Sequence, residues 1–124
     1  MIIQAPISVG ELLDKLTILN IKMERIKDID KLNNVMLEQK ELKAIADKLP
    51  APVGLDVLYK QLFQVNNELW DIEDAKRKHE KEQRFDDEFI WLARQVYLRN
   101  DYRAKLKKEI NMLLGSTIVE EKSY

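Results

Sequence analysis

The segment 9–26 carries charged side chains of both signs that could form a binding site. Glu11 and Lys15 are four residues apart, in the order that favours an ion pair on a helix. Asp14 and Lys22 also lie away from the apolar seam, and the apolar Ile18 lies among these charges. This mixture indicates a buried or interfacial patch in which charges must be paired. An ordinary solvent-exposed charged face is the alternative.

A second polar group falls inside the segment 86–114, where the apolar pattern changes phase. Asn100 and Arg103 occupy positions at which apolar residues are expected, and Arg99 and Asp101 flank Asn100. Two arginines beside an amide can hold a carboxylate or a phosphate through paired hydrogen bonds. Capping of a broken helix is the alternative. The predicted site for a small anionic ligand combines both groups: Glu11, Asp14, Lys15, Lys22, Arg99, Asn100, Asp101 and Arg103.

Two acidic pairs give a different chemical hypothesis. Glu38 and Glu41 are three residues apart, and so are Glu68 and Asp71. This order resembles the metal-binding pattern of the all-α nucleotide pyrophosphohydrolases, in which carboxylates on facing helices hold Mg²⁺ beside a triphosphate. The resemblance implies a Mg²⁺-dependent hydrolase and requires the two pairs to face each other. A solvated acidic face explains the same residues.

The sequence lacks the residues that other common catalytic chemistries require. His79 is the single histidine, it lies in a run of mixed charge, and the chain contains no cysteine. A histidine-based metal site or a Ser-His-Asp triad is therefore not expected. Gly10, Gly54 and Gly115 are isolated, so no glycine-rich phosphate loop is present.

Composition predicts one globular domain spanning residues 1–124. Apolar residues make up 45% of the chain and charged residues 35%, a mixture typical of helical globular proteins. The formal net charge of −1 does not favour binding to nucleic acid or to an anionic membrane. No stretch has the length of a membrane span or the pattern of a signal peptide, so the cytoplasm is the expected location.

Apolar spacing predicts four helices, over residues 9–26, 30–49, 55–83 and 86–114. Apolar residues recur at intervals of three and four in the first three segments, which favours an all-α antiparallel bundle of four to five helices. Ser8 and Asp30 are expected N-caps, and so is Asp86 or Asp87. The fourth segment either breaks near Asn100 or changes its packing partner there. Residues 117–119 are expected to pair with residues 2–3 as two short strands.

The segment 9–26 is apolar on more than one side, which predicts a homodimer or a higher homo-oligomer. The leading functional hypothesis is a non-catalytic, oligomeric binding or assembly module that takes a small anionic ligand. The alternatives are the Mg²⁺-dependent hydrolase and a purely structural homo-oligomeric scaffold without any ligand.

Three stretches also carry a resemblance to known sequences. They are ISVGELLDKLTIL at residues 7–19, LWDIED at residues 69–74 and VEEKSY at residues 119–124. They resemble a family of short uncharacterised proteins of bacteria and phages, catalogued as a domain of unknown function. The resemblance implies a small helical domain and leaves a phage-borne origin open. It brings no established activity and no catalytic residues.

Overall fold

The computed structural model describes all residues from 1 to 124 and contains four α-helices. Helix α1 spans Val9–Arg25, α2 spans Ile29–Ala46, α3 spans Leu55–Lys81 and α4 spans Asp87–Leu114. The prediction of an all-α fold is confirmed. None of these helices is long and apolar enough to cross a membrane.

Local capping explains where the helices begin and end. The Ser8 hydroxyl accepts a hydrogen bond from the Glu11 amide at 3.1 Å, and the Asp86 carboxylate accepts one from the Phe89 amide at 3.0 Å. Asp28, and not the predicted Asp30, caps α2 by accepting from the Lys31 amide. Each cap satisfies an amide that has no partner within its helix.

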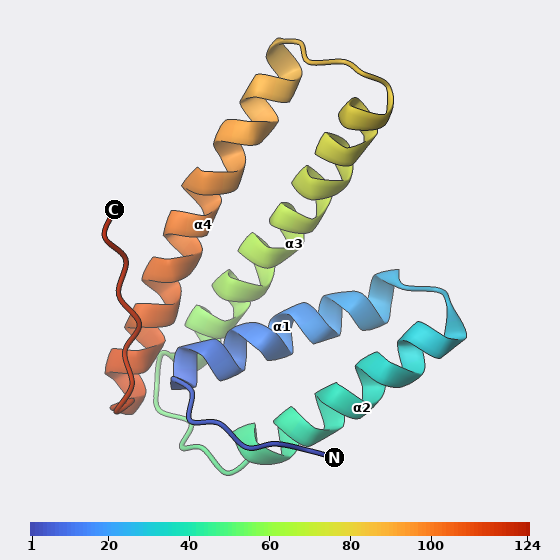
Figure 1. The fold of residues 1–124 in the computed structure, drawn as a ribbon. Coiled ribbons are helices and arrows are strands. Elements are labelled where there is room, and N and C mark those ends of the chain that lie inside the picture. Colours follow the sequence, from blue (N-terminus) through green and yellow to red (C-terminus); the bar gives the residue numbers. More distant parts are fainter.

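The four helices form two antiparallel hairpins, α1–α2 and α3–α4, which cross each other (Figure 1). Helix α1 lies between α2 and the α3–α4 hairpin and contacts all three other helices, whereas α2 contacts only α1. The end of the α3–α4 hairpin that carries its connecting loop extends beyond the α1–α2 hairpin. The apolar surface on more than one side of α1 is therefore covered within the chain itself.

The main core lies where α1 crosses the base of the α3–α4 hairpin. It contains two leucines of α1 and two side chains from each of α3 and α4. The buried members are Leu13, Leu16, Leu62, Val65, Leu106 and Ile110. This crossing holds the two hairpins in one domain and sets the register of their polar side chains.

Two predictions about the second half of the chain are settled here. The chain has no strands, so the predicted pairing of residues 117–119 with residues 2–3 is wrong. The C-terminal tail instead runs back along α4 (Figure 1) and attaches by side chains, as in the ion pair of Lys122 with Asp101. Helix α4 passes Asn100 without a break. Its packing changes instead, because Leu106 belongs to the core shared with α1, whereas Leu92 is buried outside that core.

Helices α1 and α4 approach closely at Gly10. The Gly10 amide donates a hydrogen bond of 2.6 Å to the side-chain oxygen of Asn111. A Cβ atom at Gly10 would lie 2.5 Å from the Lys107 carbonyl oxygen, which is backbone and cannot turn away. A side chain at this position would therefore push the two helices apart.

The substitution Gly10→Ala tests this approach. It should lower the free energy of unfolding by about 1–3 kcal/mol, as overpacking generally does, with urea denaturation as the measurement. The sign of the change in the free energy of unfolding distinguishes the two cases, because Gly→Ala at an open helical position stabilises a helix by up to about 1 kcal/mol. A stabilised variant would show that α1 and α4 do not meet as described.

Candidate functional site

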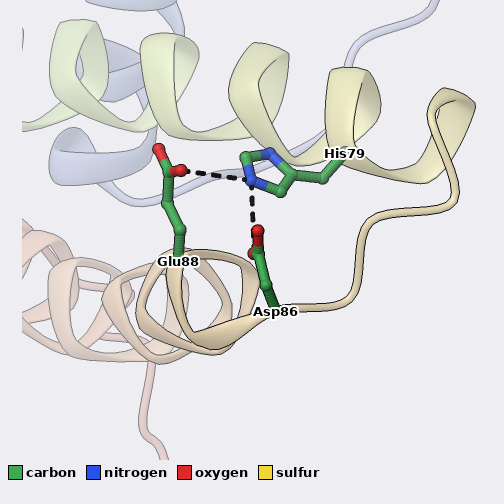
Figure 2. Close-up of side chains that lie close together, drawn as sticks. All are labelled: His79, Asp86 and Glu88. Carbon is green, nitrogen blue, oxygen red and sulfur yellow. Dashed lines mark ion pairs between the residues drawn. The ribbon is translucent and has the colours of Figure 1, made fainter.

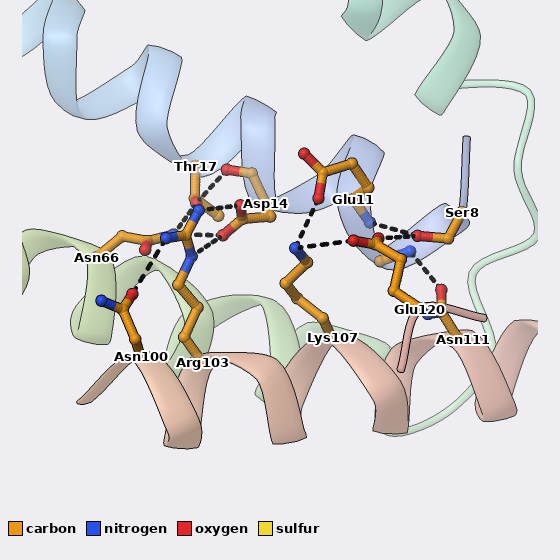
Figure 3. Close-up of polar contacts among 11 residues, drawn as sticks. Ser8, Glu11, Asp14, Thr17, Asn66, Asn100, Arg103, Lys107, Asn111 and Glu120 are labelled. Carbon is orange, nitrogen blue, oxygen red and sulfur yellow. Dashed lines mark hydrogen bonds and ion pairs between the residues drawn. The ribbon is translucent and has the colours of Figure 1, made fainter. Parts of the chain in front are cut away.

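A ladder of polar side chains joins α1 to α4 (Figure 3). On α1 and its cap the polar residues recur every three positions, as Ser8, Glu11, Asp14 and Thr17. On α4 they recur at three and four positions, and they are Asn100, Arg103, Lys107 and Asn111. The spacing on α4 keeps its members on one face of the helix, whereas a strict interval of three drifts by about 60° per step, so the row on α1 winds from the side of α4 at Ser8 and Glu11 toward Asn66 of α3 at Thr17. The two rows face each other along the length of the crossing.

Asp14 is the centre of the ladder and is only 1% exposed. Arg103 binds its carboxylate through two nitrogens, and the Nε–Oδ1 distance is 2.9 Å. Asn66 of α3 donates to the same carboxylate at 2.8 Å and also to the Thr17 hydroxyl at 2.8 Å. Hydrogen bonding to Asp14 raises the pKa of Arg103 above its usual value. The buried carboxylate is thus fully compensated, as a charge in a protein interior must be.

The other end of the ladder binds the C-terminal tail. Lys107 forms an ion pair of 2.6 Å with Glu11 and lies 3.9 Å from Glu120 of the tail. The Ser8 hydroxyl donates to Glu120 at 2.8 Å while it caps α1. Ser8 is 1% exposed. The cap of α1, the middle of α4 and the tail therefore share one polar network.

A groove of about 350 Å³ opens between α4 and the tail. Its four cationic side chains each have a carboxylate partner: Arg103 with Asp14, Lys107 with Glu11, Lys108 with Glu121, and Lys122 with Asp101. A small anion in this groove would have to replace the carboxylates of Glu120 and Glu121. The groove is lined by Asn100, Arg103, Ala104, Lys107, Lys108, Asn111, Glu120, Glu121, Lys122 and Tyr124.

The structure brings together only part of the predicted anion site. Asp14, Asn100 and Arg103 form one cluster, in which Asn100 accepts from Arg103 at 3.3 Å. Glu11 lies further along the same ladder. Asp101 is separate from the cluster and binds Lys122 of the tail at 2.8 Å.

The other three predicted residues lie outside the ladder. Lys15 is exposed and Lys22 is half-buried, and neither forms an ion pair. Arg99 is directed toward α3, where its Nε lies 3.0 Å from Glu68, and it donates to Gln95 on its own helix. A single pocket lined by both arginines and both lysines is therefore not formed.

The two acidic pairs do not share a site. Glu38 and Glu41 are exposed on α2, which has no contact with α3. On α3, Glu68 is paired with Arg99, and Asp71 is paired with Arg25 at 2.6 Å. The facing arrangement that the Mg²⁺ hypothesis requires is absent, because α1 separates α2 from α3.

Several residues of the ladder were missed from the sequence. Lys107 and Asn111 continue the spacing of Arg103 at intervals of four, so the row was visible as a polar stripe on a helix that also carries apolar stripes. Asn66 interrupts the apolar pattern of α3 and is 5% exposed. No sequence pattern pointed to Glu120, because its contacts with Ser8 and Lys107 form only when the C-terminal tail folds back along α4.

Removing the arginine of the central pair tests the importance of the ladder. Arg103→Ala should lower the free energy of unfolding by about 3 kcal/mol or more, because it leaves the Asp14 carboxylate buried without its cation. Arg94→Ala on the same helix is the matched control, since Arg94 is exposed and forms no ion pair. Its effect should stay within about 0.5 kcal/mol. If urea denaturation shows equal losses of unfolding free energy for Arg103→Ala and Arg94→Ala, the central role of the Asp14–Arg103 pair is contradicted.

Comparison with known proteins gives one match. Searches of curated proteins and of solved structures found none. The sequence model of a family of unknown function, DUF6165, matches residues 3–124. This range contains both hairpins, the polar ladder and the tail. The chain therefore belongs to this family of unknown function, DUF6165.

Proposed function

We propose that this protein is a non-catalytic assembly module that functions as a homodimer. The face that mediates dimerisation is the outer face of the α3–α4 hairpin, which lies roughly opposite α1. The observation that carries this proposal is a row of exposed apolar side chains on α4 that no other part of the chain covers.

The accessible surface indicates that part of the molecule lacks a partner. It measures 8772 Å² for a chain of 14.7 kDa, whereas a folded monomer of this mass exposes about 6,900 Å². The excess is about 1,800 Å². A stable interface of standard size buries about 800 Å² on each partner. A dimer interface can therefore be formed from the surface that this open, two-hairpin shape exposes.

The row follows the spacing of a coiled-coil seam along α4. Trp91, Leu98 and Tyr102 are 53%, 45% and 43% exposed and are separated by seven and four residues. Further along, Met112 is 70% exposed. At 100° per residue these positions lie on the side of α4 away from the polar row that faces α1. Trp and Tyr are the residues that most often dominate binding energy at interfaces.

The charges in the row favour a second copy of the chain as the partner. Between Tyr102 and Met112, the two positions on the same face of α4 are Lys105 and Glu109. Neither forms an ion pair within the chain. A two-fold axis near residue 107 would place Lys105 of each copy against Glu109 of the other. Interfaces with two-fold symmetry require this kind of self-complementarity.

Binding of a small anionic ligand stays a separate prediction. The groove between α4 and the tail is the place where the cationic side chains gather, and a ligand there would compete with the tail carboxylates. This groove does not overlap with the apolar row, so dimerisation and ligand binding would be independent.

Sedimentation velocity over a range of concentrations tests the dimer. The unmodified protein should sediment as a dimer at micromolar concentration. Tyr102→Glu should weaken association by about 30-fold or more, because the axis near residue 107 places Tyr102 of one copy against Met112 of the other, and losing a hot-spot contact costs about 2 kcal/mol. Leu37→Glu is the matched control, because Leu37 is 58% exposed on α2 and outside the row. A monomer at all concentrations, or equal effects of the two variants, would overturn the proposal.

A charge exchange tests the symmetry of the interface. Lys105→Glu and Glu109→Lys should each weaken the dimer, because each places like charges opposite one another across the axis. The double variant should restore association toward that of the unmodified protein. A double variant weaker than both single variants would reject the proposed two-fold arrangement.

A further inference from the structure

His79 near the end of α3 is buried, although it lies within a run of residues of mixed charge. Its exposed fraction is 3%. Its Nδ1 lies 2.9 Å from the carbonyl oxygen of Ala75, one helical turn earlier. A carbonyl oxygen can only accept, so Nδ1 carries a proton, and in the neutral imidazole Nε2 is the nitrogen that can bind a cation.

Nε2 points at two carboxylates from the start of α4 (Figure 2). Nε2 lies 3.6 Å from Oδ1 of Asp86 and 3.5 Å from Oε2 of Glu88. Nε2 is fully buried and has no hydrogen-bond partner. Both distances exceed the range of about 2.7–3.2 Å for N–H···O hydrogen bonds. Three atoms that can act as metal ligands thus converge at distances too long for hydrogen bonds.

The distances from Nε2 to the two carboxylate oxygens match those between the ligands of a small transition-metal ion. Zn²⁺ binds nitrogen and oxygen ligands at about 2.0–2.2 Å with tetrahedral geometry. Ligand atoms around such an ion stand about 3.3–3.6 Å apart. We infer that His79, Asp86 and Glu88 form a binding site for a divalent first-row transition ion, with Zn²⁺ as the best fit. The three ligand atoms all lie within 4.8 Å of one another.

The surroundings of His79 have the features of a metal-binding histidine. Such a histidine usually donates its second ring nitrogen to a backbone carbonyl or a carboxylate, which fixes the ring and the tautomer. Ala75 supplies that carbonyl. The Phe89 ring lies 6.2 Å from the imidazole and shields one side of it.

The charges near the site are compatible with a cation. The hydrogen bond from the Phe89 amide lowers the pKa of Asp86, so this carboxylate is charged at neutral pH. Arg84 places its Nη1 3.6 Å from Oδ2 of Asp86, which is not the oxygen nearest to His79. Its Nε is bound to Glu82 at 2.8 Å, so Glu82 shares this positive charge.

A bound ion would close the free end of the α3–α4 hairpin. His79 is in the last turn of α3, and Asp86 and Glu88 are the cap and first turn of α4. The ion would therefore join the two helices across their connecting loop. Three protein ligands leave one coordination position for water. Because the site is complete only in the folded chain, ion binding would stabilise the native state.

Isothermal titration of the metal-free protein with Zn²⁺ tests the inference. One ion should bind per chain, and binding should raise the melting temperature. Glu88→Gln should weaken Zn²⁺ binding by about 10-fold or more and reduce the rise in melting temperature. His79→Gln should abolish specific binding. Glu88 is 65% exposed in its side chain, so its variant folds even if the buried His79 does not tolerate replacement.

Asp87→Asn is the matched control, since it removes one negative charge from the same turn without touching the cluster. Its Zn²⁺ affinity should stay within about threefold of the unmodified protein. Absence of Zn²⁺ binding, or equal weakening by Asp87→Asn and Glu88→Gln, would overturn the site and leave a general acidic surface as the explanation. The inference does not depend on dimerisation.

Discussion

The buried ion pair of Asp14 with Arg103 is the interaction on which the arrangement of this molecule depends. Its carboxylate comes from α1, its guanidinium from α4 and its additional donor, Asn66, from α3. Three helices must therefore be in register before the charge is satisfied. An unpaired charge in this position costs far more than an apolar contact that is slightly misplaced. The pair thus selects one way for α1 to cross the hairpin, and Gly10 allows the close approach that this crossing needs.

Because α1 covers one side of the α3–α4 hairpin, it also determines which surfaces of this hairpin stay exposed. The outer side keeps the exposed row that includes Trp91, Leu98 and Tyr102. The distal end extends beyond the α1–α2 hairpin and carries the connecting loop. A metal ion bound by His79 and its two carboxylates would join α3 and α4 at this end. Assembly and metal binding are thus separate properties of one extended hairpin.

Local features of the fold were predictable from the sequence, and long-range ones were not. Ser8 and Asp86 act within one helical turn, so their residue types were sufficient to predict where two helices begin. The partner of Asp14 is 89 residues away, and only the packing of α1 on α4 brings it close. A histidine-based site was not expected because His79 lies in a run of mixed charge, although it follows the buried Ile72 by seven residues and thus shares its face.

A double-mutant cycle on Asp14 and Arg103 tests the central claim most directly. Urea denaturation would give the free energy of unfolding for Asp14→Ala, Arg103→Ala and the double variant. If the pair selects the crossing, the double variant should lose less stability than the two single losses together, by about 2 kcal/mol or more, because neither charge is then left buried alone. Losses that add within about 0.5 kcal/mol would show that the two residues act independently and that the core alone determines the crossing.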